Sequence, residues 1–445
     1  MNTSFDSDAQ ALSPRSENRS PRRGRYILIA LLGIILLVPL TALAAVGGLL
    51  PASAINPVAR LFVGRQPDAV PWVDNQPVTV LVMGLQIGGA STNPLTDSMM
   101  VVAYDPPTGS LSMLSIPRDL WVEIPGHGQG RINEAFEDGG APLAMLTVQQ
   151  NLGIPVNYYA LVSYSAFRKL IDDVGGVTVN VPRDLDDPTF PADDEIHFEP
   201  LHLKAGVQHM DGREALRFAR ERHADPLGDI GRAQNQQQVL LALKDQLLKP
   251  ANVLKAGLIL RDIRSMVRTN FPLDQAAGLG LQALKAGKGN IYRDVLRYDN
   301  KTVQGTITAS GADVLMLNQQ ASKPVIASLF GPALSGFKAG AKVRVDNGNG
   351  YPLAGTGYSK VLANMGAKML EPGDADRTDY PGARVRVFTR DADKVREAGL
   401  LASMLGVPLE KASGSDPADI VVTLGRDYAP FVKFTSADWE KAIKP

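Results

Sequence analysis

The sequence predicts an α/β protein with a mixed sheet, preceded by an N-terminal transmembrane helix. Three observations predict this class. Short apolar strands alternate with segments of helical period after residue 78. Two of these strands are joined by a turn typical of a hairpin, so part of the sheet is expected to be antiparallel. Residues 26–50 contain no charged side chain, and a helix of that length can cross a hydrocarbon layer of about 30 Å.

The composition narrows the classes of function. A chain of 445 residues with 44% hydrophobic residues can fill a sizeable core, which excludes disordered and collagen-like proteins. Lys+Arg and Asp+Glu both number 46, so the basic excess expected of a general nucleic-acid binder is missing and any anion site must be local. The chain contains no cysteine, which excludes disulfides, zinc–thiolate sites, iron–sulfur clusters and thiol nucleophiles.

Charge sets the expected topology at the N-terminus. Arginines cluster before the uncharged run, at Arg15, Arg19, Arg22, Arg23 and Arg25. The positive-inside rule therefore predicts a cytoplasmic tail at 1–25, an anchor at 26–50 and an exported remainder. The alternative is a cleaved signal peptide with a small-residue site at 42–44 or 52–54, and it exports the same chain. The long tail favours the anchor. Residues 51–77 carry five prolines among polar residues, which indicates a linker.

The folded part is expected to start with strands. They are predicted at 78–84, 98–104, 110–116 and 177–181. The turn Asp-Pro-Pro-Thr-Gly at 105–109 joins the second strand to the third as a hairpin. Ser165 is expected to cap a helix that ends at Gly175. Together these elements predict an α/β fold with a mixed sheet.

Two helices are predicted between 211 and 248. Asp211 and Glu214 form a capping-box pattern at the start of the first helix. After a break rich in proline and glycine, the second helix begins near Asp229. Asp229, Arg232 and Gln236 have the spacing i, i+3, i+7, so they project from one face at the electropositive end of that helix.

Arginines gather around the same two helices. They are Arg213, Arg217, Arg220, Arg222 and Arg232, and Arg118 follows a predicted strand end upstream. The guanidinium fork suits phosphate because it donates two parallel hydrogen bonds and keeps its charge. Spacing alone gives equal weight to solvated arginines paired with nearby Asp and Glu. Arg220 and Arg222 cannot share a helix face, so joint use requires the first helix to end near them.

Five motifs recur together in one order. They are Leu-Thr-Asp-Ser-Met-Met at 95–100, Ser-Ile-Pro-Arg-Asp at 115–119, Arg-Ile-Asn-Glu-Ala at 131–135, Gly-Gly-Val at 175–177, and Ala-Leu-Arg-Phe-Ala-Arg-Glu-Arg-His at 215–223 with Gly-Asp-Ile-Gly-Arg at 228–232. Order and spacing resemble the LytR-CpsA-Psr family over residues 78–250, continuing to about 300. Residues 341–427 resemble the LytR C-terminal domain, on the pattern Val-Arg-Val-Asp-Asn-Gly at 343–348 and a strand at 418–425.

The resemblance implies a domain organisation. Residues 78–300 would form a three-layer α/β/α catalytic domain with a mixed central sheet, residues 301–340 a connection, and residues 341–430 a smaller C-terminal α/β domain. The order β-α-β-α-β expected in the last unit is large enough for its own core. We expect that unit to bind the wall or another protein.

The resemblance also implies a function. Such proteins are membrane-anchored phosphotransferases that act outside the cell. They move a glycopolymer, such as teichoic acid or capsular polysaccharide, from polyprenyl pyrophosphate to peptidoglycan, typically to the 6-hydroxyl of N-acetylmuramic acid, and release polyprenyl phosphate. Hydrolysis of the pyrophosphate is a possible side activity. The expected partners are therefore the lipid-linked donor, the peptidoglycan acceptor and the membrane, with no nucleic acid.

Site roles follow from matching motifs. The pyrophosphate would be held by Arg118, Arg131, Arg220, Arg222, Arg232 and Gln236. Asp97 would bind magnesium, a hard cation that prefers carboxylate and phosphate oxygens. Asp229 would orient an arginine or accept the proton of the attacking hydroxyl. The expected catalytic residues are thus Asp97, Arg118, Asp229 and Arg232, and an apolar cavity beneath the sheet would hold the prenyl tail.

Two positions depart from the family pattern. Gln86 stands where a metal-associated Asp is usual, and Asn235 precedes Gln236 where Arg is frequent. A neutral amide binds magnesium less well, which leaves open the alternative of a non-catalytic binder of lipid-linked wall precursors. A further alternative, a transcriptional attenuator or regulator, follows from the label that relatives in this family have carried. The acidic stretch 184–195, followed by His197 and His202, matches no metal-ligand spacing and is interpreted as a solvated loop.

Overall fold

The computed structural model describes residues 77–85, 95–192, 197–284, 286–297, 299, 301–330, 337, 339–351, 354–426 and 428. The expected tail, the anchor and all but the last residue of the linker lie outside the described residues, as does Gln86. In the part of the chain that is described, no helix combines the length and hydropathy needed to cross a bilayer.

A six-stranded mixed sheet forms the centre of the first domain. Its strands are β1 (Val78–Leu85), β2 (Thr96–Asp105), β3 (Ser110–Ile116), β6 (Tyr158–Ser163), β11 (Val267–Thr269) and β12 (Ile291–Val295), in the order β11-β6-β1-β2-β3-β12. β1 runs antiparallel to β2 and parallel to β6. β3 is antiparallel to β2 and parallel to β12. The predicted strands, hairpin and mixed sheet are confirmed.

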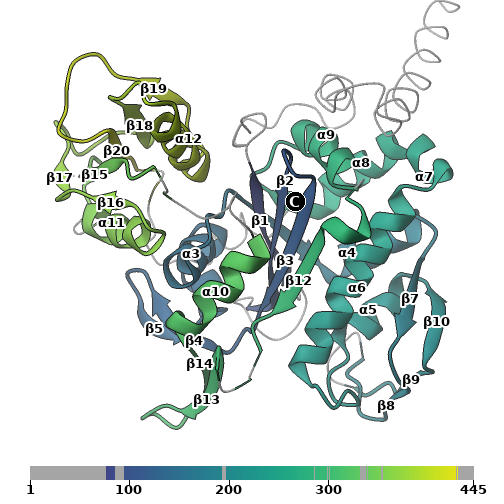
Figure 1. Ribbon diagram of the computed structural model, residues 1–445. Helices are drawn as coiled ribbons and strands as arrows, with labels where there is room; N and C mark the ends of the chain where they lie inside the picture. The colour runs from purple at the N-terminus through teal and green to yellow at the C-terminus, as the bar shows by residue number, and fades with distance from the viewer. Residues whose placement is uncertain are drawn as a thin grey trace, which may run out of the picture.

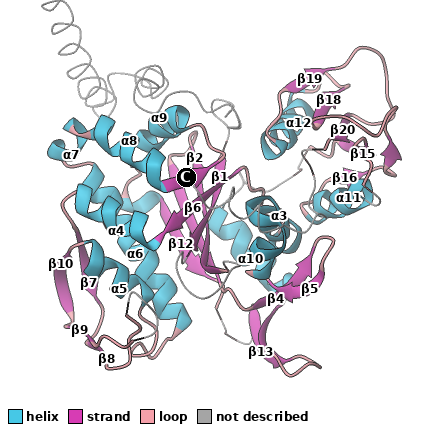
Figure 2. Ribbon diagram, turned by 180° about the vertical axis from the view of Figure 1, so that it is seen from behind, coloured by secondary structure: helices cyan, strands magenta, loops and turns pink. Residues whose placement is uncertain are grey.

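Alternate residues of the strands point into two different cores. Leu81 and Met83 of β1 pack with α3 (Glu134–Leu152) and α10 (Gln319–Phe330). Val80 faces the other way and packs with α9 (Leu273–Leu284). The helices α4 (Tyr164–Asp173), α5 (Gly212–Arg220), α6 (Asp229–Leu247), α7 (Pro250–Leu254) and α8 (Ala256–Met266) lie on the α9 side (Figures 1 and 2). This side-to-side alternation produces three layers.

Local sequence signals set most helix ends. Asp211 accepts a hydrogen bond from the Glu214 N–H at 2.8 Å, as the capping pattern predicted. At α4 the cap is Ser163 and not the expected Ser165, because Ser163 Oγ accepts the Ala166 N–H at 3.1 Å. Ser163 is the last residue of β6, so the strand passes directly into the helix.

Two small sheets lie outside the central one. β7 (Val177–Val181) pairs with β10 (Gly206–Met210), and β8 (Leu185–Asp187) pairs with β9 (Leu201–Leu203). Their apolar residues share a core with α4, α5 and α6. The strand predicted at 177–181 is confirmed, but it belongs to one of these outer sheets.

Much of the expected connection at 301–340 folds with the first domain. β13 (Val303–Ile307) and β14 (Asp313–Leu317) form a hairpin, and β14 pairs with β4 (Leu120–Ile124), which pairs with β5 (Gly128–Arg131). Val303 and Phe330 belong to the same core as α3. A one-turn 3₁₀ helix (Lys288–Asn290) precedes β12. The first domain therefore continues to about residue 330.

The C-terminal domain has its own sheet and core. Its strands are β15 (Lys342–Asn347), β16 (Lys368–Met369), β17 (Gly373–Asp374), β18 (Arg384–Val387), β19 (Leu409–Lys411) and β20 (Ile420–Leu424), with α11 (Ala354–Asn364) and α12 (Ala392–Leu405). The predicted β-α-β-α-β order is confirmed, with short strands added.

The C-terminal domain docks on α3 of the first domain. Leu146 of α3 is buried in the C-terminal core. Asn364 at the end of α11 donates a hydrogen bond to the Gln150 carbonyl at 3.0 Å, and Lys360 forms an exposed ion pair with Glu123. Figure 1 shows this domain on the α3 side, away from α5 and α6.

Candidate functional site

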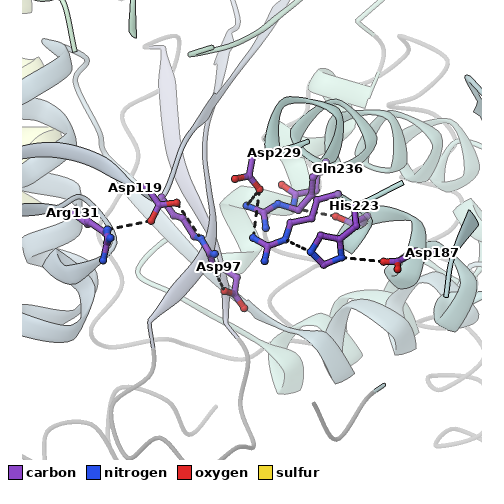
Figure 3. Close-up of polar contacts among 11 residues, drawn as sticks. Asp97, Asp119, Arg131, Asp187, His223, Asp229 and Gln236 are labelled. Carbon is purple, nitrogen blue, oxygen red and sulfur yellow. Dashed lines mark hydrogen bonds and ion pairs between the residues drawn. The ribbon is translucent and has the colours of Figure 1, made fainter. Parts of the chain in front are cut away.

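The β2–β3 hairpin brings the first two predicted residues together. Asp97 is near the start of β2, and Arg118 follows the end of β3. Because Met99 pairs with Ile116, these positions meet at one end of the hairpin. Arg118 donates to Asp97 Oδ1 at 3.1 Å (Figure 3), and the Tyr164 hydroxyl donates to Oδ2 at 2.8 Å.

The end of α5 separates two of the predicted arginines. The helix ends at Arg220, and Glu221 has an extended conformation. Arg220 and Arg222 can therefore serve the same site, as the sequence required. The Arg220 guanidinium lies over the Tyr164 ring, 4.8 Å from its centroid, and 5.5 Å from that of Phe190. Both distances are typical of cation–π contacts.

Buried carboxylates shape the junction between α5 and α6. Glu221 accepts the Ala224 N–H at 2.7 Å. Asp225 is buried and accepts the Leu227 N–H at 2.9 Å and the Arg183 guanidinium at 3.0 Å. These contacts close two tight turns, so the junction presents Arg222 and Asp229 in a defined geometry.

The two glycines of the Gly-Asp-Ile-Gly-Arg motif are required at their positions for different physical reasons. Gly228 has φ +54°, a left-handed conformation that favours glycine, immediately before α6 starts. Gly231 lies against the Asp225 carboxylate, where a Cβ atom would overlap it. The motif thus lets α6 start close to the turn.

The first turns of α6 place the remaining predicted residues. Arg232 pairs with Asp229 Oδ1 at 3.0 Å, and Arg222 lies 3.9 Å from the same oxygen. Gln236 donates to the Ala219 carbonyl at the end of α5, at 3.2 Å. The neighbouring Asn235 is buried and donates to the Phe218 carbonyl, so this departure from the family pattern helps to satisfy the end of α5.

Arg232 is the most deeply placed of these cations, with 14% of its side chain exposed. Burial lowers the pKa of the Arg232 guanidinium below its usual value. The Asp229 carboxylate opposes this shift, and the charges of Arg118 and Arg222 add to it. An anion bound among these guanidinium groups would relieve their mutual repulsion.

Two cavities share this cluster as a wall. The first, of about 440 Å³, lies on the side of α4 and α5. The second, of about 390 Å³, lies toward β3, β12 and β14. The residues common to both are Asp97, Ser98, Arg118, Arg232 and Gln236. Arg220 and Arg222 line the first cavity alone, and Asp229 lines the second alone.

Beyond this wall the first cavity is largely apolar. It extends between the sheet and the helices α4, α5 and α6. Its apolar lining includes Val82, Met100, Val162, Phe167, Leu170, Phe190, Leu216, Leu240 and Leu243. An aliphatic chain could therefore leave water there while a charged group at its end stays among the arginines.

Two residues that the sequence did not predict, His223 and Asp187, also contact the arginine cluster. Arg222 Nε donates to His223 Nε2 at 3.3 Å, and His223 Nδ1 lies 3.1 Å from Asp187 Oδ2 (Figure 3). Only 2% of the Asp187 side chain is exposed, and its Oδ1 accepts two hydrogen bonds from Thr189. Burial raises the pKa of Asp187, but the hydrogen bonds from Thr189 and His223 outweigh it and leave the pKa below its usual value.

The interpretation of 184–195 as a solvated loop is therefore wrong at Asp187. Leu185 and Asp187 are both buried, whereas Asp186 between them is exposed. That alternation is the pattern of a strand, in which residues i and i+2 face the same side. In the sequence, the apolar Leu185 two positions before Asp187 is the signal that could have placed Asp187 on the buried side.

Arg131 occupies a different position from the other predicted arginines. It does not line either cavity. Its Nε lies 3.3 Å from Asp119, and it donates to the Asp313 carbonyl at 3.2 Å. Asp119 in turn lies 3.6 Å from Arg118 Nε. The link from Arg131 to the cluster thus runs through Asp119.

The residues of this site suit a magnesium ion that is held by one carboxylate together with the phosphates of a substrate. Among the described residues, no three carboxylate or imidazole groups converge as metal ligands. Asp97 is the one described acid that lines both cavities. Magnesium is commonly held by one or two carboxylates together with substrate phosphates, and Asp97 fits that mode.

Comparison with known proteins decides the family. The model of the LytR_cpsA_psr family matches residues 60–323, which is more than half of the chain. The chain belongs to the LytR-CpsA-Psr family. Residues 340–428 match the model described as LytR cell envelope-related transcriptional attenuator, in agreement with the predicted C-terminal domain.

Relatives in this family carry two kinds of name. The regulatory protein MsrR of Staphylococcus aureus is 33% identical over 253 residues, covering 56% of this chain and 73% of MsrR. The polyisoprenyl-teichoic acid–peptidoglycan teichoic acid transferase TagV of Bacillus subtilis is 35% identical over 216 residues, covering 48% of this chain and 54% of TagV. The chain thus spans about half the length of TagV. The crystal structure of B. subtilis TagV aligns with a TM-score of 0.48 at 28% identity, over 58% of this chain and 98% of that one.

Proposed function

We propose that this LytR-CpsA-Psr protein moves a glycopolymer from polyprenyl pyrophosphate to peptidoglycan, forming a phosphodiester with the 6-hydroxyl of N-acetylmuramic acid and releasing polyprenyl phosphate. One observation carries the proposal: four arginines gather at the mouth of an apolar cavity. A lipid pyrophosphate has both chemistries, an aliphatic chain and a compact polyanion. The name of TagV as a teichoic acid transferase supports the same reaction class.

The donor would bind across the wall of the first cavity. The pyrophosphate oxygens would be held by residues that line this cavity, and the prenyl chain would lie between the sheet and α4. These residues are Arg118, Arg220, Arg222, Arg232 and Gln236. Phosphoryl transfer is catalysed largely by positioning and by neutralising charge, which fixed guanidinium groups supply without deprotonating.

The transfer balances without an oxidant or reductant. The acceptor hydroxyl oxygen bonds to the phosphorus that carries the glycan. The bond from that phosphorus to the bridging oxygen breaks, and its electron pair leaves with polyprenyl phosphate. The hydroxyl proton passes to a base, and we assign this role to Asp229, an acid that lines the second cavity. Arg232 and Arg222 hold Asp229 through Oδ1. Water in place of the sugar hydroxyl would give the pyrophosphatase side activity.

Magnesium belongs to this proposal at Asp97. When bound, the ion would neutralise charge on the pyrophosphate. Asp97 would orient it, while Arg118 and Tyr164 fix the carboxylate. Glutamine at position 86 lies outside the described residues.

The reaction requires the folded domains and the lipid donor on the same side of a membrane. We propose the topology expected from charge, with residues 26–50 as an anchor and the domains outside the cytoplasm. A reporter fused after Pro445 that is active only in the cytoplasm should be silent, and an export-dependent reporter should be active. The reverse pattern would support the regulator alternative.

The decisive test measures transfer by the full-length protein in detergent or lipid discs. It is given a synthetic polyprenyl-pyrophosphate oligosaccharide, peptidoglycan oligomers and magnesium. We expect joined glycan and polyprenyl phosphate in equal amounts. Arg232→Ala should abolish both, whereas Arg213→Ala should not, because Arg213 is exposed and paired with Glu199. Absence of joined product from the wild-type protein would refute the transferase.

A further inference from the structure

With the prenyl chain assigned to the first cavity, the second cavity is left without an assigned occupant. It lies at the ends of β3, β12 and β14, whereas the apolar cavity lies over β6, β1 and β2. Its own walls are contributed by Ser115, Pro117, Leu227, Asp229, Ala233 and Leu315, among others. Asp97, Arg118 and Arg232 stand between the two spaces, so a phosphate held there is reachable from both sides.

In an in-line displacement, the nucleophile and the leaving group occupy opposite sides of the arginine wall. The attacking and leaving oxygens lie on opposite sides of the transferring phosphorus. If the prenyl phosphate departs toward the apolar cavity, the nucleophile must approach from the opposite side of the arginine wall. Of the two cavities that share this wall, the second is then the one left for the nucleophile.

We propose that the second cavity is the acceptor site and takes a pyranose with a free primary hydroxyl. This inference rests on the proposed transferase function. The bonds formed and broken are those of the transfer step described above. The glycan of the donor is attached through an oxygen off the reaction axis, so it does not occupy the line along which the acceptor oxygen approaches the phosphorus.

The chemistry of the walls fits a sugar. Leu227, with 43% of its surface exposed at the edge of the cavity, and Leu315 offer apolar surface to the C–H face of a pyranose ring. Exposed leucine at a concave site is more informative than an isolated one elsewhere.

Asp229 supplies the polar end of the same site. Each of the two arginines approaches Asp229 most closely at Oδ1. Within the described residues, Oδ2 accepts no hydrogen bond, so it can accept the proton of the sugar hydroxyl. The two arginines keep this carboxylate in place at the start of α6.

The test narrows each cavity separately in the full-length protein. Leu227→Trp and Ala233→Leu add bulk to the second cavity only, and Leu170→Trp adds bulk to the first only. Leu254→Trp is the matched control, because Leu254 is 62% exposed on α7 and lines neither cavity. Donor Kd is measured by titration with a synthetic polyprenyl-pyrophosphate oligosaccharide. Acceptor KM is measured with a defined peptidoglycan disaccharide-peptide.

We expect Leu227→Trp and Ala233→Leu to raise acceptor KM at least fivefold, about 1 kcal/mol, with donor Kd within twofold of wild type. Leu170→Trp should show the opposite split. Unchanged acceptor KM in both second-cavity variants would overturn the acceptor site. A parallel rise in donor Kd would overturn it too, by assigning the cavity to the donor glycan. If wild type itself transfers nothing, the proposed function fails first and the acceptor site fails with it.

Discussion

His223 Nδ1 lies 3.1 Å from Asp187 Oδ2, and this contact connects an outer two-stranded sheet to the arginine cluster. The buried carboxylate fixes the imidazole, and the imidazole accepts a hydrogen bond from Arg222. A guanidinium group on a chain turn thereby acquires a fixed orientation. Because the Arg222 side chain is already held in one orientation, donor binding loses less conformational entropy, and the donor binds more tightly.

Replacing the buried member of this pair tests its contribution. Asp187→Asn should weaken donor binding about tenfold, because a hydrogen bond to a charged group is worth about 1.5–3 kcal/mol. Donor titration measures the effect. Asp186→Asn is the matched control, since Asp186 makes an exposed pair with His202 on the same two strands. Equal Kd values for the two variants would exclude a role for Asp187.

The shape of the Arg232 side chain should matter as much as its charge. Arg232→Lys keeps a cation but loses the fork that contacts Asp229 and faces both cavities. We expect transfer to fall about ten- to a hundredfold, the range for losing one or two charge-assisted hydrogen bonds. The rate of polyprenyl phosphate release measures it, with the exposed Arg213→Lys as control. Full activity of Arg232→Lys would show that charge alone suffices.

Gly231 should tolerate no side chain. Gly231→Ala forces the Asp225 carboxylate away from its turn, and overpacking of this kind costs about 1–3 kcal/mol. Thermal unfolding and donor titration should both be impaired. Gly280→Ala is the matched change inside α9, where a Cβ meets no atom within 4 Å. It should stabilise the protein slightly. A Gly231→Ala protein as stable as wild type would contradict the packing argument.

Glu221 predicts an unusual dependence of stability on pH. Its side chain is fully buried, one carboxylate oxygen has no hydrogen-bond partner, and burial raises its pKa. The folded state therefore holds this proton more tightly than the unfolded state. Stability is lost as the pH rises from the unfolded pKa, about 4.3, through the raised folded pKa.

The matched variant removes this titration. Glu221→Gln retains an oxygen for the Ala224 N–H but cannot ionise. Its melting temperature should exceed that of wild type at pH 8, and the difference should shrink toward pH 4. Unfolding curves at several pH values measure it. A constant difference between variant and wild type across this range would show that Glu221 ionisation is not responsible.

Docking of the C-terminal domain should depend on one apolar contact more than on its ion pair. Leu146→Ala leaves a cavity in the C-terminal core and costs about 2–5 kcal/mol. We expect limited proteolysis to release the C-terminal domain faster. Lys360→Ala removes only an exposed pair with Glu123, which is worth less than about 1 kcal/mol. Equal cleavage rates in both variants would argue against a role for Leu146.

Local chemistry explains what the sequence predicted well. The β2–β3 hairpin, the Asp211 cap and the end of α5 between Arg220 and Arg222 each depend on neighbours within a few residues. Such features are visible without the fold. The four predicted arginines that line the cavities, Arg118, Arg220, Arg222 and Arg232, were singled out because the order of several motifs identifies a family even when distances in space are unknown.

Long-range pairing explains what the sequence missed. Asp187 becomes buried only because β8 pairs with β9 and a histidine from the α5–α6 junction covers it. Residues 303–330 join the first domain because β14 pairs with β4, about two hundred positions upstream. Arg131 matched a motif, yet its side chain turns to Asp119, a choice that spacing cannot reveal.

The Asp97–Arg118 contact joins residues only 21 positions apart, within one hairpin. Closing so short a loop costs little entropy, so this part of the site can form early and locally as the chain folds. Arg232 lies on α6, more than a hundred positions further along the chain. The wall shared by the two cavities is therefore complete only when α6 has docked. A nascent chain that has made its hairpin alone would therefore lack a working site, which ties the onset of activity to completion of folding.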